Sequence, residues 1–184
     1  DGDGYEVIAG QRRVRASELA GINTVPAFVL PLDRDRVIIT LVDSNLQREN
    51  ILPSERAFAY KMKSEAMKRQ GFRTDLTSSQ VVTKLRTDDK VAQGFGVGRM
   101  TVQRFIRLTE LIPPILQMVD EGKIALTPAV ELSFLKKDEQ ENLFATMESE
   151  EATPSLSQAQ RMKQLSQSGR LDMDTIFAIM TEEK

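Results

Sequence analysis

The chain contains no histidine and no cysteine among its 184 residues. Without cysteine there can be no disulfide framework and no thiol nucleophile, and without histidine the commonest general base and metal ligand near neutral pH is missing. Tryptophan is absent as well, and aromatic residues make up only 5% of the sequence. These absences exclude catalytic triads and zinc sites of the usual kinds.

Long apolar runs and a strong net charge are also missing. The longest apolar run, from Val37 to Val42, is far too short to cross a bilayer, and the sequence shows no signal peptide before Tyr5. We therefore expect a cytoplasmic protein that does not contact a membrane. The formal net charge of -2 argues against a polybasic coat, although segregated charges could still leave one basic face. The hydrophobic content of 40% suffices for one ordinary domain or two small ones.

Three arginines crowd the start of a predicted helix near the N-terminus. The apolar residues 5–9 predict a strand that runs into Gly10, and residues 11–20 predict a helix that Gly21 closes. The first turn of a helix carries partial positive charge, so a cluster of arginines there is unfavourable unless an anion binds beside it. Backbone N–H groups at a glycine turn together with guanidinium forks favour a phosphate or polyphosphate. The alternative is that these arginines are solvated or pair with nearby carboxylates.

The segment up to residue 52 predicts a mixed α/β arrangement. Residues 1–4 predict a hairpin turn, which implies a partner strand upstream, and residues 25–30 predict a short strand. Residues 37–42 are β-branched and predict a strand by propensity, but a helix running into Asn45 is possible if packing overrides propensity.

From Pro53 onward the sequence predicts only helices. Pro53 suits the first position of a long connecting helix that reaches Arg69 and ends at Gly71. Thr77 with Gln80 forms a capping box for a helix to Arg86. Further helices are predicted over residues 87–92, over 99–108, from Pro113 to a stop at Gly122, and over 127–135, 139–147, 157–166 and 172–180.

A helix-turn-helix is predicted around the glycines of residues 96–98. In such motifs the second helix enters the major groove of DNA and presents its N-terminal residues to base edges. Val102, Phe105, Ile106 and Leu108 supply the core stripe of that helix. The residues that we expect to contact bases are Arg99, Met100, Thr101, Gln103 and Arg104, while Lys84, Lys90 and Arg107 are expected to contact phosphates. Lys136 and Lys137 are expected to form a solvated face.

Two sequence boxes, followed by the helix-turn-helix, resemble the ParB-like chromosome and plasmid partition family over nearly the whole chain. The first box of that family, Gly-Glu-Arg-Arg-x-Arg-Ala, is similar to Gly10-Gln11-Arg12-Arg13-Val14-Arg15-Ala16, and the second, Glu-Asn-x-x-Arg-Glu, is similar to Ser44-Asn45-Leu46-Gln47-Arg48-Glu49. The resemblance implies an α+β protein, with a small N-terminal mixed α/β ParB/sulfiredoxin-like domain followed by an all-α helix-turn-helix domain. It divides the chain into a nucleotide-binding domain (1–52), a connecting helix (53–72), a helix-turn-helix domain (73–152) and C-terminal helices (153–184).

The same resemblance implies a ligand set and partners. The N-terminal domain of the family binds CTP with Mg²⁺, the helical domain binds a centromere-like site on double-stranded DNA, and nucleotide binding closes a homodimer into a clamp around DNA. A ParA-type ATPase is the usual motor partner, and the protein is nucleoid- or plasmid-associated. The implied nucleotide-binding residues are Gly10, Gln11, Arg12, Arg13, Asn45, Arg48 and Glu49. Asn45 and Glu49 are the implied Mg²⁺ ligands, and Glu49 is the one candidate catalytic residue.

The departures from the family pattern affect hydrolysis and target choice. Gln11 and Ser44 stand where the family has carboxylates, and their loss should weaken metal-assisted CTP hydrolysis more than phosphate contact. Residues 127–130, Thr-Pro-Ala-Val, replace a Gly-His-Ala-Arg sequence near the DNA. The stretch 70–88 is longer than typical members need, which resembles a subgroup on mobile elements. Two further hypotheses therefore remain: a mobile-element DNA-binding regulator with a degenerate nucleotide site, and a ParB-like nuclease or sulfiredoxin-like phosphotransfer enzyme.

Overall fold

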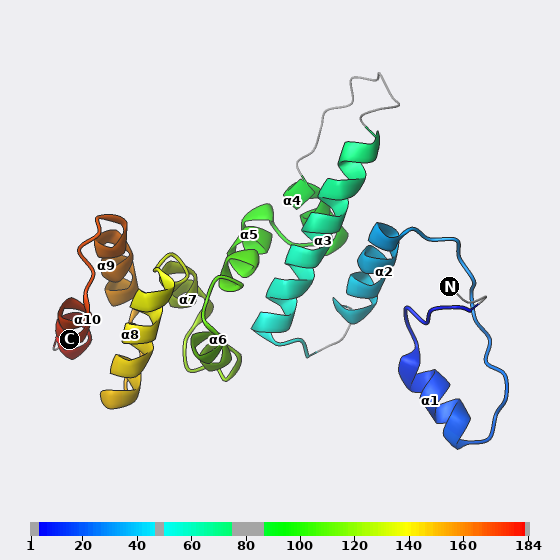
Figure 1. Ribbon diagram of the computed structural model, residues 1–184, viewed down its shortest axis with the longest axis horizontal. Helices are drawn as coiled ribbons and strands as arrows, with labels where there is room; N and C mark the ends of the chain where they lie inside the picture. The colour runs from blue at the N-terminus through cyan, green and yellow to red at the C-terminus, as the bar shows by residue number, and fades with distance from the viewer. Residues whose placement is uncertain (1–3, 47–49, 75–86, 183–184) are drawn as a thin grey trace.

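The computed structural model describes residues 4–46, 50–74 and 87–182, which form an elongated array of helices (Figure 1). The N-terminal helix lies at one end of the array and the C-terminal helices lie at the other. The helices are α1 (Gln11–Leu19), α2 (Arg34–Leu46), α3 (Pro53–Thr74), α4 (Thr87–Gly94), α5 (Arg99–Leu108), α6 (Pro113–Asp120), α7 (Leu126–Leu132), α8 (Lys137–Ser149), α9 (Leu156–Gln167) and α10 (Met173–Thr181).

The predicted mixed α/β character of the N-terminal domain is not confirmed, because the residues described here contain no β-strand. Residues 5–9 and 25–30, both predicted as strands, have no regular secondary structure. A strand is stable only when a neighbour satisfies its N–H and C=O groups, and neither segment has such a neighbour within the described chain. Residues 37–42 lie in α2, so packing overrides their strand propensity there. The predicted hairpin turn at residues 1–4 extends outside the described residues.

The N-terminal helix contributes nothing to the buried core. No residue of α1 is buried, and large apolar side chains on both sides of it face solvent, with Phe28 fully exposed and Tyr5 83% exposed. The first helix that packs firmly is α2, which lies against α3. Val42 of α2 is buried there, and two ion pairs flank it: Arg69 to Asp35 at 2.8 Å and Lys63 to Asp43 at 2.5 Å.

The long helix α3 supports the helix-turn-helix through an aromatic cluster. Tyr60 of α3 lies with its ring centroid 5.3 Å from that of Phe95 and 5.8 Å from that of Phe105, the second pair edge-on. Burial of Tyr60 raises the pKa of its hydroxyl, an effect that nearby Arg56 partly offsets. Because α3 contacts both α4 and α5, this cluster sets the orientation of both helices.

The remaining helices share one continuous core with α3, α4 and α5. Within it α7 packs on α9, and α8 packs on α10. The core side chains with no exposure include Ile115, Leu132, Leu143, Met162 and Ile176. The fold therefore continues without a break in the core from α3 to α10.

Most predicted helices from Pro53 onward are confirmed within a few residues. Gly122 follows the end of α6 with φ of +72°, as expected for a glycine that stops a helix. The long helix α3 continues to Thr74 instead of ending at Gly71. The helix predicted over residues 77–86 lies outside the described residues. No helix in the described part of the chain combines the length and the apolar character that a membrane span requires.

Candidate nucleic-acid interface

The turn between α4 and α5 is short and is fixed by backbone hydrogen bonds. The N–H of Val97 donates to the carbonyl of Ala92 at 3.1 Å, and Gly96 has φ of +62°, a conformation that favours glycine. Gly98 then begins α5 with an extended backbone, and the N–H groups of Thr101 and Val102 donate to its carbonyl. The predicted pair of short helices is thereby confirmed, with α5 in the position of the second, DNA-reading helix of such motifs.

One side of α5 is buried and the opposite side is open. Val102, Phe105 and Leu108 form the buried side, and the 100° step per residue of an α-helix puts Met100 and Gln103 on the opposite side. Met100 is 63% exposed, and Gln103 is exposed as well. Arg99 and Arg104 are half-buried along the flanks. Thr101 and Arg107 are half-buried as well, while Lys90 of α4 is exposed.

Two of the predicted base-reading side chains contact carboxylates of α4. The Gln103 side-chain amide donates to Asp88 at 3.0 Å, and the Arg99 guanidinium lies 3.8 Å from Asp89. Both carboxylates stand in the first turn of α4, where the helix dipole favours negative charge. The contact between Arg99 and Asp89 is long and half-exposed, and such pairs contribute little. The arginine can therefore exchange this carboxylate for a phosphate or a guanine at small cost.

Arg104 is held by the segment 127–130, in which the sequence departs from the family pattern. Its guanidinium donates a 2.6 Å hydrogen bond to the hydroxyl of Thr127, in the first turn of α7. The segment 127–130 thus lies directly beside α5. This hydrogen bond requires a hydroxyl or another acceptor at position 127.

A contact that sequence reasoning missed fixes the C-terminal end of α5. Arg107 donates to the hydroxyl of Ser133 at 3.1 Å and to its carbonyl at 2.8 Å. The same guanidinium stacks 4.0 Å from the ring centroid of Phe134, and the ammonium of Lys163 on α9 lies 3.9 Å from that centroid. Arg107 and Lys163 are 56 positions apart in the sequence, so no local pattern could have indicated that they share one aromatic ring.

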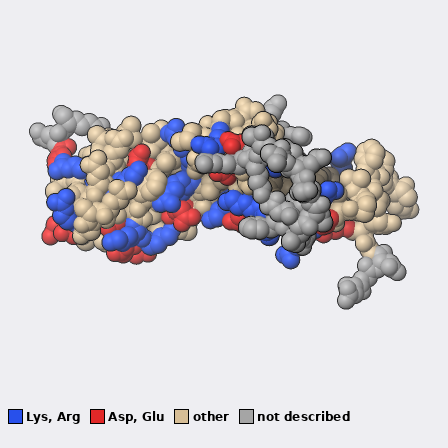
Figure 2. Space-filling view, turned by 90° about the horizontal axis from the view of Figure 1, so that it is seen from above, with Lys and Arg blue, Asp and Glu red and all other residues tan. Residues whose placement is uncertain are grey.

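On one face of the described chain, basic side chains do not form an unbroken surface. On the face shown in Figure 2, lysine and arginine alternate with acidic residues along the helical part of the molecule. This mixture agrees with the net charge of -2. This face therefore offers no general positive field to a polyanion.

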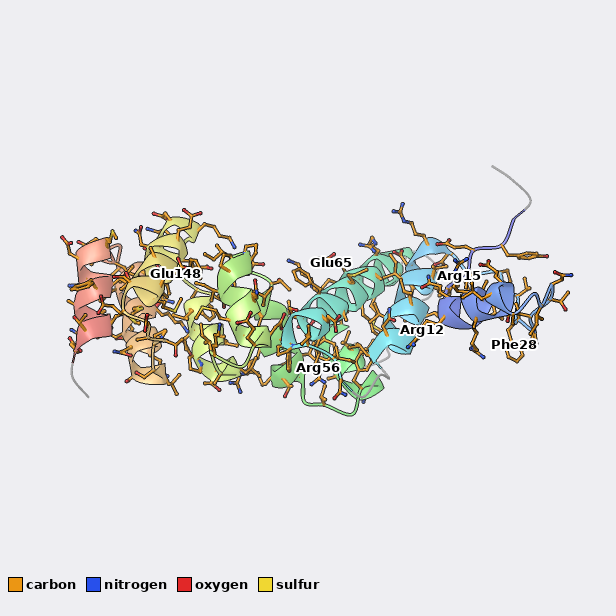
Figure 3. The ribbon with its side chains drawn as sticks, turned by 90° about the horizontal axis from the view of Figure 1, so that it is seen from below. Arg12, Arg15, Phe28, Arg56, Glu65 and Glu148 are labelled. Atoms are coloured by element: carbon orange, nitrogen blue, oxygen red, sulfur yellow. The ribbon has the colours of Figure 1, made fainter. Side chains whose placement is uncertain are left out.

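The first predicted phosphate box forms the turn into α1. Gly10 has φ of +92° and begins the helix, and the N–H groups of Arg13 and Val14 donate to its carbonyl at 2.9 and 3.1 Å. Arg13 folds back over this turn, since a Cβ placed on Gly10 would lie 3.4 Å from its Nη2. Arg12 and Arg15 lie on α1 at the far end of the molecule from Glu148 (Figure 3). Gln11, Arg12 and Arg13 are exposed, and Arg15 pairs with Glu18 at 3.0 Å.

The second predicted phosphate box is described only in part. Asn45 is half-buried in the last turn of α2, and the hydroxyl of Ser44 donates to the carbonyl of Leu41 at 2.8 Å. Arg48 and Glu49 lie outside the described residues, as does Lys84. Within the described segments no three acidic side chains are close enough to hold a metal ion. The predicted roles of Asn45, Arg48 and Glu49 toward CTP and Mg²⁺ therefore stay predictions.

Two family models match the two parts of the chain. Residues 1–46 match the ParB N-terminal domain, and residues 76–170 match the ParB HTH domain. The probable chromosome 1-partitioning protein ParB of Deinococcus radiodurans is 39% identical over 129 residues, which cover 70% of this chain and 38% of that protein. The chromosome-partitioning protein Spo0J of Thermus thermophilus is 36% identical over 139 residues, which cover 75% of this chain and 45% of that protein. The chain thus spans less than half the length of these relatives.

A solved structure shares the fold. The crystal structure of the C-terminally truncated chromosome-partitioning protein ParB from Caulobacter crescentus, complexed to the centromeric parS site, aligns with a TM-score of 0.51 and 24% identity. The alignment covers 95% of this chain and 73% of that one. The two helices α4 and α5 form a helix-turn-helix, a motif typical of nucleic-acid-binding folds. Together with the matches to both family models, it shows that the chain belongs to the ParB family.

Proposed function

We propose that this chain is a DNA-binding partition protein that recognises a centromere-like duplex site through α5. The observation that carries the proposal is the open side of α5, where the exposed Gln103 lies between the half-buried Arg99 and Arg104 on the flanks and stands opposite the apolar buried side. Arginine pairs bidentately with guanine and glutamine with adenine, and each such pair contributes about 1–3 kcal/mol of discrimination. The names of the relatives from Deinococcus radiodurans and Thermus thermophilus describe both as chromosome-partitioning proteins.

DNA binding would exchange contacts that already exist in the free chain. Asp88 and Asp89 hold Gln103 and Arg99 over α4, and a guanine edge or a phosphate offers a guanidinium two acceptors in place of one. Thr127 holds Arg104, and Ser133 holds Arg107. Because these long side chains are already ordered, they lose less conformational entropy when DNA binds.

The turn at Gly10 would bind the triphosphate of CTP. Its left-handed glycine permits a close approach of the backbone, and Arg12 and Arg13 are exposed beside the N–H groups of the first turn of α1. Asn45, Arg48 and Glu49 would complete the site. A bound Mg²⁺ would neutralise phosphate charge there, with Asn45 and Glu49 as its protein ligands. Since Gln11 and Ser44 carry no negative charge, we expect CTP binding with weak hydrolysis or none.

Binding of CTP would control a homodimer that closes around DNA, with a ParA-type ATPase as motor partner. Two copies of the chain would place two α5 helices on the two half-sites of one duplex. The protein would then be cytoplasmic and associated with the nucleoid or a plasmid.

Selection from a random duplex library tests the DNA part, and titration with CTP tests the nucleotide part. We expect the chain to enrich one inverted-repeat sequence, and calorimetry to show CTP binding that Arg13→Ala abolishes. Arg15→Ala is the matched control, because Arg15 is paired with Glu18 on the same helix. Failure to enrich any sequence would reject the recognition role of α5. Unchanged CTP heat in the Arg13 variant, or none in the parent, would reject the phosphate site alone.

The second candidate function is a mobile-element regulator whose nucleotide site is degenerate. The specific observation in its favour is that Ser44, in place of a family carboxylate, uses its hydroxyl within α2. Under this function the chain would enrich one duplex sequence but would give no heat with CTP. The same two experiments therefore separate the two functions.

A further inference from the structure

A groove of about 640 Å³ runs between α6 and the C-terminal half of α8. Its apolar floor consists of Met118, Phe144, Met147 and Ala152. Met147 is fully within the core, and the other three are partly buried side chains packed against that core. These two helices lie next to each other (Figure 1). The floor is therefore continuous with the core, and its partly buried members remain open to solvent.

The rim of the groove is acidic. Its charged lining residues are three carboxylates and one cation, namely Glu121, Glu148, Glu151 and Lys123. Lys123 is already paired with Glu121 at 2.7 Å, and hydrogen bonds from Lys123 and Gln117 lower the pKa of the Glu121 carboxyl, so Glu121 stays ionised. Glu148 and Glu151 are exposed and form no ion pair within the described chain. The groove thus presents uncompensated negative charge around an apolar floor.

The acidic residues occupy positions that are unfavourable for the folding of α8 itself. Glu148 lies in the last turn of α8, where the helix dipole is negative and favours cations, and that turn has no basic residue. Glu151 follows the helix with φ of +47°, a left-handed conformation in which glycine is the preferred residue. A cationic ligand would compensate the unfavourable charge of Glu148.

We propose that this groove binds a basic amphipathic helix of a partner protein. Apolar side chains of that helix would insert between Met118, Phe144 and Met147, and its lysines or arginines would pair with Glu148 and Glu151. Methionine suits such a floor because its flexible, polarisable side chain adapts to the shape of an inserted group. The arrangement is the helix-in-groove mode of recognition, with charge complementarity that selects a basic ligand and repels nucleic acid.

Methionine-methyl NMR of the full chain tests where such a helix binds. The probe is a 14-residue synthetic peptide with leucines on one helical face and lysines elsewhere, and its control is the same peptide with glutamate in place of lysine. We expect the basic peptide to shift the methyl signals of Met118 and Met147 and to leave that of Met100, exposed on α5, unchanged. The acidic peptide should shift none. Shifts centred on Met100, or equal binding of both peptides, would overturn the proposal.

Charge reversal on the rim tests the electrostatic part. The double variant Glu148→Lys/Glu151→Lys should bind the basic peptide at least about tenfold more weakly, because two close charge pairs become repulsive. Glu141→Lys is the matched control, since Glu141 is exposed on the same helix but does not line the groove. The control variant should bind like the parent. Loss of affinity in both variants, or in neither, would overturn the proposal.

Glu151→Gly separates binding from folding. Glycine relieves the left-handed strain, so the melting temperature should rise, while loss of the carboxylate should weaken peptide binding. Unchanged peptide affinity in this variant would show that Glu151 does not contact the ligand and would overturn its assignment. Self-association of the parent that the double variant abolishes would assign the groove to a second copy of this chain and would also overturn the proposal. None of these outcomes depends on DNA or CTP binding.

Discussion

Lys63 of α3 joins Asp43 of α2 across 2.5 Å, and its ammonium also lies 4.2 Å from the ring centroid of Phe95 in the turn before α5. The Lys63 side chain is only 5% exposed. Asp43 directly precedes the predicted second phosphate box, and Phe95 belongs to the helix-turn-helix turn. One buried cation therefore connects the two parts of the chain that are expected to bind nucleotide and DNA.

Removing the carboxylate from this pair should destabilise the fold. Asp43→Ala leaves a buried ammonium without its counter-ion, and we expect a loss of about 2 kcal/mol, less than for a fully buried pair because Asp43 is 39% exposed. Adding Lys63→Met should recover most of that loss, since both charges are then absent. Urea denaturation measures both effects. Lys61→Met is the control on the same helix, where the pair with Glu110 is exposed and should contribute less than about 1 kcal/mol. If the losses of stability from Asp43→Ala and Lys63→Met simply added in the double variant, the two residues would not be coupled.

Arg104→Ala should weaken specific DNA binding by about 1–3 kcal/mol, while the helices remain folded. The guanidinium is hydrogen-bonded to Thr127, and the substitution leaves the buried side of α5 unchanged. Fluorescence anisotropy with the selected duplex at fixed salt measures the loss. Arg161→Ala provides the matched control, because Arg161 pairs with Glu182 on the C-terminal helices. Equal affinity of the Arg104 variant and the parent would remove this residue from the interface.

Gln140→Leu should destabilise the helical part by about 2–4 kcal/mol, through the loss of buried hydrogen bonds. Its side chain has no exposure, accepts a 2.8 Å hydrogen bond from the N–H of Ile112 and donates to the carbonyl of Leu135 at 2.9 Å. Leucine would leave both backbone groups buried without a partner. Thermal denaturation followed by circular dichroism measures the loss, and Gln117→Leu, on the exposed surface of α6, serves as control. A change of similar size in the two variants would argue against this role.

Acidification should loosen α10 through its N-terminal cap. Hydrogen bonds from the hydroxyl and the N–H of Thr175 lower the pKa of Asp172 below its ordinary value of 3.8. The pKa of the Asp172 carboxyl is lower in the folded chain than in the unfolded chain. Its contribution to stability is therefore fully present at pH values above the unfolded pKa, and it is lost as the pH falls through the folded pKa. Asp172→Ser keeps a cap oxygen but does not titrate. The melting temperature of the parent should therefore fall more steeply than that of the serine variant below about pH 4. Parallel pH profiles of the two proteins would contradict this assignment.

The helices from Pro53 onward could be predicted because their signals are local. Proline at the first turn of α3 and α6, and glycine after α6, act through the backbone of the residues beside them. The same holds for the turn at Gly10 and for the buried stripe of α5. The strand predictions at residues 5–9 and 25–30 were wrong within the described chain because strand formation depends on a neighbour, which no local pattern supplies.

The amino-acid sequence by itself determined where most helices begin and end, which family boxes are present, and which side of α5 is apolar, since these follow from residue type and short-range spacing. Only the tertiary structure decided that residues 37–42 lie in a helix, because that choice depends on packing against α3. It also decided that Arg107 shares the Phe134 ring with Lys163, and that Met118 and Phe144 meet in one acidic-rimmed groove. Contacts between residues far apart in the chain depend on how the helices pack together, and no local pattern specifies them.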